Sequence, residues 1–369
     1  MDLPTTFSDF LKDIRPDTDQ QSRMKAAHEE LRSKLEQDKE LSSILLGTFI
    51  QGSYRRHTGI RGNAKNPCDV DVVVVTSLPH LPQMAAHALE VFRPFLKQHY
   101  PGLFTQQDRS WCINVGDDVK LDLVPTAEPE DRLLEWLRSK ALDAGAFPSL
   151  KTSALTSLQP KTAEQLILEA AEVERGWDRA EPLWIPNAMR TAWEQTHPLA
   201  QIAWTAEKNK ACAGHFVGVV KVLKWWKRTM APSPKRPKGY PLEFLVGDCC
   251  PSGINSVAEG LAATLEEIRD RFQRDAVAST TPVLPDRDLP ANNVFARIDG
   301  NDFACFHGHI AAAADLARRA VDARDRDDSQ RLWHELLGDP FPAPQTDASK
   351  QGGFTTPARP SAPAGGRFA

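Results

Sequence analysis

The chain has 369 residues, 41% of them hydrophobic, which is enough to bury a substantial core and to form two domains. Its formal net charge of −4 at pH 7 disfavours a protein that coats nucleic acid, although it leaves room for a local basic pocket. The N-terminus lacks a basic segment followed by an apolar one, and no apolar run is long enough to span a membrane, which predicts a cytoplasmic protein.

The first predicted element is a long helix over residues 16–46. Thr18 and Gln21 have the spacing of a capping box at its start. Met24, Leu31 and Leu35 recur near helical spacing among many charged residues. We therefore expect a long helix to open the fold.

Residues 47–130 are predicted to form an α/β core. Four short apolar segments have the composition of strands and are separated by Gly, Pro and Asn: GTFI, VDVVVV, WCINV and VKLDLV. The segment QMAAHALEVFRPFLKQHY, between the second and third of them, has the periodicity of a helix.

Two carboxylates stand at the head of the valine-rich segment. In a strand, Asp69 and Asp71 project from the same face, roughly 7 Å apart. Two acids held side by side repel each other and destabilise the fold unless a positive group lies between them. Asp122 stands between two leucines in a later segment, so it faces away from them and adds a third acid on a neighbouring strand.

Three converging carboxylates are typical of a site for two Mg²⁺ ions, which take oxygen ligands and neutralise the acids. Gly52 and Ser53 add a phosphate-binding turn, because glycine allows close approach of the backbone and serine supplies a hydroxyl. His57 either contacts a phosphate or orients this turn. Each motif alone is common, but their order and spacing favour a nucleoside triphosphate site over surface acids beside an ordinary turn.

The rest of the chain is predicted to be mainly helical. Residues 130–200 contain two helical segments, EDRLLEWLRSK and KTAEQLILEAAEVERGW, and a stretch around WIPN that the pattern does not assign. Residues 205–338 are mainly helical. From Asp339 the chain is rich in Pro and Gly without hydrophobic periodicity, which predicts a flexible tail. The expected domains are residues 1–200, 201–338 and 339–369.

A basic segment lies in the helical part, next to Trp225, Trp226 and Tyr240. Cations beside aromatic rings suit phosphate binding and base stacking. For most of these cations a solvated helix face followed by a basic loop is the better explanation, and only Lys224 and Tyr240 are kept as candidates. The cations are Lys221, Lys224, Lys227, Arg228, Lys235, Arg236 and Lys238.

The cysteines and histidines indicate no further site. Six cysteines are scattered without C-x-x-C spacing, which predicts reduced, mostly buried thiols, the adjacent Cys249 and Cys250 included. The segment CFHGH offers Cys305, His307 and His309, but the spacing matches no standard zinc pattern and a fourth ligand is missing. We assign no metal there.

A set of motifs spread over nearly the whole chain carries a family resemblance: GSYRRHTGIR, DVDVVVV, KLDLV, THPLAQIAWTAEKN, VVKVLKWWKR, KGYPLEFLVG, NNVFARIDGNDFACF and the closing GGFTTP…GRFA. The chain resembles the nucleotidyltransferase superfamily of DNA polymerase beta. Within it, the chain most resembles the bacterial cGAS/DncV-like nucleotidyltransferases, the cyclic-oligonucleotide synthases of anti-phage CBASS operons, and among these clade D. The resemblance implies an α+β fold in which a polymerase-beta-like core with a mixed sheet packs against a mainly helical C-terminal lobe.

The resemblance also implies roles in the core. Asp69 and Asp71 would ligate two Mg²⁺ ions, and Asp122 would complete the metal site and help to deprotonate the attacking ribose hydroxyl. Gly52 and Ser53 would hold the phosphates of the donor nucleotide.

In the helical lobe, Lys224 matches a triphosphate-binding lysine and Tyr240 matches an aromatic position that stacks on a base. Gly239 departs from the pattern of some relatives, which have a phosphate-contacting serine there. At the C-terminus, an E1/E2-like conjugating enzyme encoded in such operons would join the carboxylate of Ala369 to target amines.

The function implied by the resemblance is the joining of ATP with GTP into a cyclic trinucleotide that acts on a downstream effector, with release of pyrophosphate. A cyclic dinucleotide synthase is one alternative. A template-independent RNA or tRNA nucleotidyltransferase is another, but it would use an extended basic surface, which the net charge of −4 disfavours. An inactive nucleotide-binding module would be expected to lack one of the acids. We expect no obligatory nucleic-acid partner and no membrane.

Overall fold

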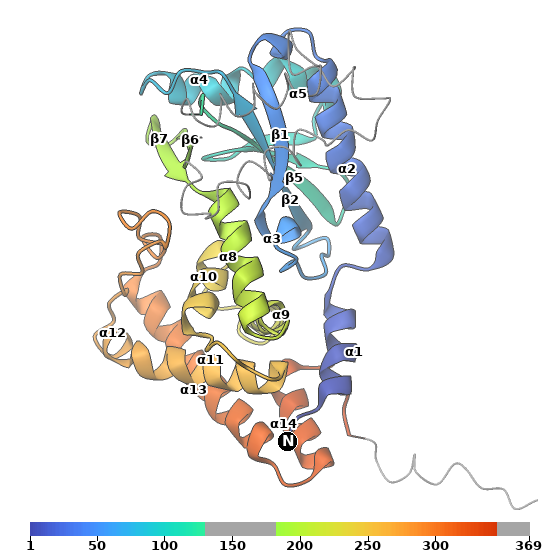
Figure 1. The fold of residues 1–369 in the computed structure, drawn as a ribbon, viewed down its shortest axis with the longest axis vertical. Helices are drawn as coiled ribbons and strands as arrows, with labels where there is room; N and C mark the ends of the chain where they lie inside the picture. The colour runs from blue at the N-terminus through green and yellow to red at the C-terminus, as the bar shows by residue number, and fades with distance from the viewer. Residues whose placement is uncertain (130–181, 345–369) are drawn as a thin grey trace, which may run out of the picture.

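The computed structural model describes residues 1–129 and 182–344. Within these ranges the chain forms a mixed β-sheet with helices against it and a second lobe built from helices (Figure 1). Helix α8, Pro198–Ala211, lies between the two parts (Figure 1). The expected α+β architecture is thereby confirmed.

A five-stranded sheet forms the centre of the first lobe. In sheet order the strands are β1 (Leu45–Gln51), β2 (Cys68–Thr76), β5 (Val119–Pro125), β4 (Trp111–Asn114) and β3 (Phe104–Gln106). Strands β2 and β5 are parallel, and the other neighbours are antiparallel. The run Val72–Val75 of β2 is buried without alternation, which is typical of a strand covered on both faces. All four expected strands are present; β3 is an addition.

Helix α2, Thr18–Gln37, packs Met24, Leu31 and Leu35 against the sheet. It is shorter than the helix expected over residues 16–46, and its cap is Asp17 instead of Thr18, because the Asp17 carboxylate accepts a hydrogen bond from the backbone of Gln20 at 2.8 Å. The expected helix ends early because the chain next forms a short 3₁₀ turn, Leu41–Ser43, and then joins the sheet as β1.

The helix expected between the second and third strands is divided in two. Helix α4 spans Met84–Glu90 and helix α5 spans Arg93–His99. Pro94 lies in the first turn of α5, where its missing N–H is not needed and its ring would clash with a preceding helical turn. The proline therefore separates two helices that share one apolar pattern.

Helix α1, Pro4–Ile14, precedes the expected first helix and packs on the other lobe. Phe7 lies 5.0 Å from Trp333, and Phe10 lies 5.4 Å from Phe341, measured between ring centroids. The N-terminal segment thus contributes to the helical core although the sequence groups it with the sheet. The division at residues 200 and 338 stays a prediction.

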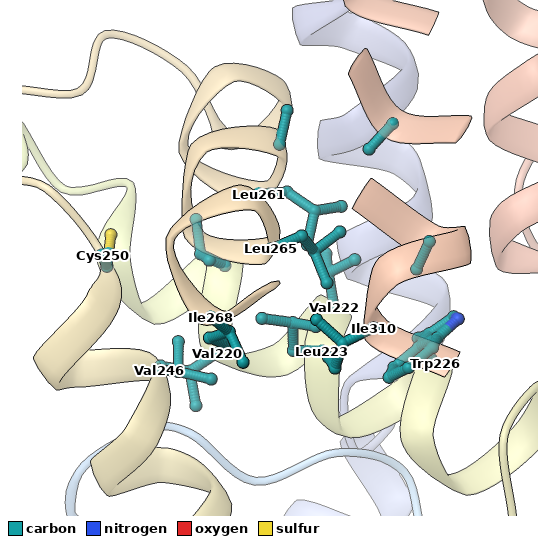
Figure 2. Close-up of a cluster of buried hydrophobic side chains, with 14 of the residues drawn as sticks. Val220, Val222, Leu223, Trp226, Val246, Cys250, Leu261, Leu265, Ile268 and Ile310 are labelled. Carbon is teal, nitrogen blue, oxygen red and sulfur yellow. The ribbon is translucent and has the colours of Figure 1, made fainter. Parts of the chain in front are cut away.

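The second lobe is helical, as expected for residues 205–338. Besides α8, its helices are α9 (Phe216–Thr229), α10 (Tyr240–Cys249), α11 (Val257–Arg271), α12 (Gln273–Val277), α13 (Gly300–Asp322) and α14 (Arg326–Leu337). Figure 2 shows part of their common core, where Leu223 from α9, Val246 from α10, Leu265 from α11 and Ile310 from α13 point toward one another.

The stretch around WIPN, which the sequence pattern did not assign, is strand β6. It spans Leu183–Asn187 and pairs in antiparallel fashion with β7, Ala192–Thr196. The two helical segments expected between residues 130 and 181, and almost all of the expected tail, lie outside the described residues. Every helix in the described residues is too short or too polar to cross a bilayer.

The docking of α1 gives a stability prediction. Phe10 is fully buried between α1 and the helical lobe, so Phe10→Ala should lower the free energy of unfolding by about 3–5 kcal/mol. Asp9→Ala, on the exposed side of the same helix, should change it by no more than about 0.5 kcal/mol. Urea denaturation followed by circular dichroism measures both values, and equal effects of the two substitutions would contradict the packing of α1.

Candidate active site

Three carboxylates meet at the centre of the sheet. Asp71 on β2 is the register partner of Asp122 on the parallel strand β5, and Asp69 lies two residues earlier on the same face as Asp71. One carboxylate oxygen from each of the three acids lies within 4.8 Å of the others. The structure therefore brings together the three acids that the sequence singled out.

Burial and mutual repulsion disfavour three ionised acids at this spacing. The pKa of Asp71 is raised to about 8 by burial and by the charges of Asp69 and Asp122. The pKa of Asp122 is raised to about 7 by burial and by Asp69. Burial also raises the pKa of Asp69, whose Oδ1 atom is enclosed without a hydrogen-bond partner.

The acid cluster fits a divalent cation. Carboxylate oxygens are the ligands that Mg²⁺ prefers, and a bound cation would remove the repulsion that raises these pKa values. The unsatisfied Oδ1 of Asp69 would gain a partner in the same step. Asp69, Asp71 and Asp122 are the residues that would hold the metal.

Lys120 is a fourth charged residue at this site, and the sequence analysis missed it. Its Nζ atom lies 3.4 Å from Oδ2 of Asp69 and 3.8 Å from Oδ2 of Asp122. Its charge opposes the effect of burial on the pKa of both acids. The signal was present in the sequence, because Lys120 precedes Asp122 by two positions in one strand and so shares its face.

The glycine of the Gly-Ser turn lies directly against the acids. β1 ends where Gln51 pairs with Asp71, and the short helix α3, Gly52–Arg55, follows at once. Gly52 has φ of +72°, and a Cβ added there would lie 1.8 Å from Oδ2 of Asp71. Only glycine is compatible with this position, because of both the conformation and the contact.

Ser53 begins a chain reversal that the backbone stabilises. Its carbonyl oxygen accepts hydrogen bonds from the N–H groups of Thr58 at 2.9 Å and Gly59 at 3.2 Å. His57 lies inside this reversal, exposed, with φ of +58°. Its pKa is lowered by burial of part of the ring and by the charges of Arg55 and Lys221.

Lys224 and Tyr240 lie on the helical lobe, at α9 and at the start of α10. The Nζ atom of Lys224 donates to Glu243 at 2.8 Å. The hydroxyl of Tyr240 donates to Asp286 at 2.9 Å, and the guanidinium of Arg56 lies 5.7 Å from its ring centroid. Their roles in nucleotide binding stay predictions.

One cation of the basic segment is not solvated, contrary to expectation. Lys227 is buried, and its Nζ atom donates to the carbonyl oxygen of Ala231 at 2.8 Å and to that of Pro234. Three prolines follow α9 within a few residues, and the loop's carbonyl groups lack a helical partner there. Lys227 therefore stabilises the loop between α9 and α10.

The CFHGH segment places its side chains on different sides of α13. The Nε2 atom of His307 lies 2.8 Å from the carbonyl oxygen of Arg269, on the buried side. Cys305 is exposed, and its Sγ atom lies 3.9 Å from Nε2 of His309. All six cysteines are free, and the other five are buried.

Comparison with known proteins places this site in a family. Residues 1–138 match the Second Messenger Oligonucleotide or Dinucleotide Synthetase domain. The chain is 38% identical over 383 aligned positions to a cyclic AMP-AMP-GMP synthase of Enterobacter hormaechei, covering 100% of both chains. It is 27% identical over 340 positions to a cyclic AMP-AMP-AMP synthase of an Acinetobacter species, covering 91% of this chain and 84% of that one.

Solved structures share the fold at low sequence identity. CdnG of Bradyrhizobium diazoefficiens, solved in complex with GTP, superposes with a TM-score of 0.64 at 13% identity, covering 90% of this chain and 94% of that one. CdnC of E. coli MS115-1, solved with ATP, gives 0.61 at 16% identity, covering 92% and 99%. The fold and the acid site define a nucleotidyltransferase. The chain belongs to the bacterial cGAS/DncV-like nucleotidyltransferases of the CBASS type, the cyclic-oligonucleotide synthases.

The contact between Gly52 and Asp71 gives a prediction about the site. Gly52→Ala should displace the Asp71 carboxylate and reduce nucleotide joining by about 10- to 100-fold, because a misplaced metal ligand costs about this much. Gly59→Ala is the matched control, since no atom lies nearer than 3.9 Å to its added Cβ, and it should keep nearly full activity. Pyrophosphate release from NTPs measures both. Equal activity of the two variants would show that Gly52 does not constrain Asp71.

Proposed function

We propose that the protein is a Mg²⁺-dependent synthase that joins two molecules of ATP and one of GTP into a cyclic trinucleotide. The observation that carries this proposal is the convergence of Asp69, Asp71 and Asp122 beside the Gly52 turn, in a chain that matches a cyclic AMP-AMP-GMP synthase over its full length. The activity for which that relative is named supports the choice of bases and of ring size.

The reaction assigns a role to each residue of the core. A ribose hydroxyl attacks the α-phosphorus of a second nucleotide, a P–O bond to the ribose forms, and the bond to pyrophosphate breaks. Bound Mg²⁺ ions would supply Lewis-acid stabilisation of the attacking and leaving oxygens. Asp69, Asp71 and Asp122 would hold the metal, and Asp122 helps to accept the hydroxyl proton. Gly52 and Ser53 hold the donor phosphates.

The helical lobe would bind the rest of the nucleotide. Lys224, on the α9 face that carries the ion pair to Glu243, contacts the triphosphate. Tyr240 stacks on a base, and its hydrogen bond to Asp286 fixes the orientation of the ring. Stacking is tolerant of base identity, so Tyr240 contributes affinity for nucleotides in general and not the choice between them.

The alternatives have less support. A cyclic dinucleotide synthase would use the same core, but the relatives matched over their full length are named for three-nucleotide products. A polymerase or tRNA nucleotidyltransferase would use an extended basic surface, which the net charge of −4 disfavours. An inactive module would not be expected to keep three acids at metal-binding spacing.

The proposal predicts the products of a nucleotide assay. Purified protein with ATP, GTP and Mg²⁺ should form a phosphatase-resistant product, and CTP with UTP should give little. Asp69→Asn with Asp71→Asn should abolish the product, because the metal loses two charged ligands. Chromatography of labelled products after phosphatase treatment measures the outcome.

The control is the stability of the double variant in a chelator. It should melt no lower than the wild type, because the two carboxyl groups that are replaced are buried, and they repel each other when both are ionised. Normal product from the folded double variant, a pyrimidine-only product, or extension of an added RNA primer would each contradict the proposal.

The proposed setting follows from membership of the family. We propose that the enzyme works in the cytoplasm in anti-phage defence, and that its product acts on a downstream effector. An E1/E2-like enzyme of the same operon is the proposed partner for the C-terminus. Gly365, Gly366 and Ala369 are small enough to enter a narrow conjugation site, and they lie outside the described residues.

A truncation tests this proposed partner. Deleting Phe368 and Ala369 should leave basal nucleotide joining unchanged, and it should abolish covalent conjugates when the operon's conjugating enzyme and ATP are present. Gel analysis under denaturing conditions detects the conjugates. Internal substitution of Thr355 by Ala is the matched control and should leave conjugation intact. Conjugates formed by the truncated protein, or none formed by the full-length protein, would exclude Ala369 as the conjugation point.

A further inference from the structure

A buried carboxylate from the helical lobe reaches the segment after the Gly-Ser turn. Glu243 lies in the first turn of α10 with a side chain that is only 8% exposed. Its Oε2 atom accepts hydrogen bonds from the hydroxyl of Thr58 at 2.8 Å and from Arg56 Nη2 at 3.2 Å and Nε at 3.3 Å. Its Oε1 atom accepts from Lys224 at 2.8 Å. One side chain thus contacts both lobes.

The charges of this cluster do not cancel. Burial alone would raise the pKa of Glu243, but Lys224, Arg56 and the Thr58 hydroxyl lower it to about 2, so the carboxylate is ionised. One negative charge therefore faces two positive ones. The surplus positive charge lies in a low-dielectric environment, where its attraction for an anion is stronger than it would be in water.

Backbone hydrogen bonds connect the cluster to the Gly-Ser turn. Thr58 and Gly59 donate to the carbonyl oxygen of Ser53, and the N–H of Arg56 donates to that of Gly52 at 3.1 Å. Any shift of Arg56 and Thr58 would therefore move the turn as well. The Oε2 atom of Glu243 binds Arg56 and Thr58, and its Oε1 atom binds Lys224.

A gain in folding stability does not by itself explain a buried ion-pair cluster of this kind. A buried ion pair often contributes no more to folding than apolar residues of the same volume, because the charges lose their hydration. A carboxylate with four hydrogen bonds does, however, define the distance and direction between its partners in a way that apolar packing does not. The geometry of the cluster therefore favours a role in alignment.

We infer that Glu243 is a positioning residue for nucleotide binding. It holds Lys224 of the helical lobe and the Gly52–Ser53 turn of the sheet lobe at the distance that one triphosphate spans. The inference rests on the proposed function, in which these two elements bind the phosphates of the donor. Glu243 itself does not touch the nucleotide. Its loss would weaken binding in the ground state and leave the acid cluster in place.

The test is Glu243→Gln, which keeps the volume and the hydrogen bond from Thr58 but removes the charge. The Kd for a non-hydrolysable ATP analogue with Mg²⁺ should rise about tenfold or more, and KM for ATP should rise in parallel, because the loss of alignment outweighs the gain in positive charge; a lower Kd would overturn the inference. The value of kcat should change by less than about threefold, because the metal ligands are untouched. Thr58→Val is the milder second variant; it removes one hydrogen bond and should raise Kd by about threefold.

Glu266→Gln is the matched control. Glu266 on α11 accepts a hydrogen bond from Arg318 on α13 at 2.8 Å. Replacing Glu266 therefore removes a charged hydrogen bond that belongs to the same lobe but not to the cluster. It should leave Kd and KM unchanged. Thermal melting of all variants reports on stability separately.

A double variant separates alignment from general stabilisation. If Glu243 acts through Lys224, then adding Glu243→Gln to Lys224→Met should raise Kd by less than about threefold beyond Lys224→Met alone. A lower melting temperature of Glu243→Gln with unchanged Kd and KM would overturn the inference, and so would fully multiplicative effects of the two substitutions. A wild type that binds the analogue but makes no cyclic product would overturn only the proposed function, because the Kd comparison does not depend on the product.

Discussion

The register between β2 and β5 is the constraint on which the site depends. It sets Asp71 opposite Asp122 and leaves Asp69 on the same face. A slip of one residue would turn one set of carboxylates to the opposite side of the sheet, because side chains alternate along a strand. The buried run Val72–Val75 opposes such a slip, since it would have to be repacked against both covering layers. β1 brings the Gly-Ser turn to the site by pairing Gln51 with Asp71, so Gly52 lies directly beside the acids.

The parts of the site that depend on the local periodicity of the strands were predictable from the sequence. Alternation along one strand predicts that Asp69 and Asp71 share a face, and the leucines around Asp122 predict the direction of its side chain. The same reasoning extends to Lys120. The helical lobe was predictable as helices, since its apolar residues recur with helical spacing, and Figure 2 shows the core that they form.

Contacts between distant segments were not predictable in this way. Glu243 is separated from Arg56 by 187 positions, and no local pattern distinguishes it from an ordinary acidic residue in the first turn of a helix. The packing of α1 on the far lobe, and the burial of Lys227 under its loop, likewise depend on which surfaces tertiary structure brings together. Helix propensity predicts that these segments are helical, but it does not predict which segments pack against them.

Hydrogen bonds to three helices hold the segment between the Gly-Ser turn and β2. Arg228 of α9 donates to the carbonyl oxygen of Arg61 at 2.7 Å, and the N–H of Arg61 donates to Ile14 at the end of α1 at 2.7 Å. Gly62 accepts a hydrogen bond from Gln20 of α2 at 3.0 Å. This segment follows Gly52 and leads into Asp69. The segment therefore has contacts with both lobes, and it lies between the glycine that touches Asp71 and the strand that carries Asp69.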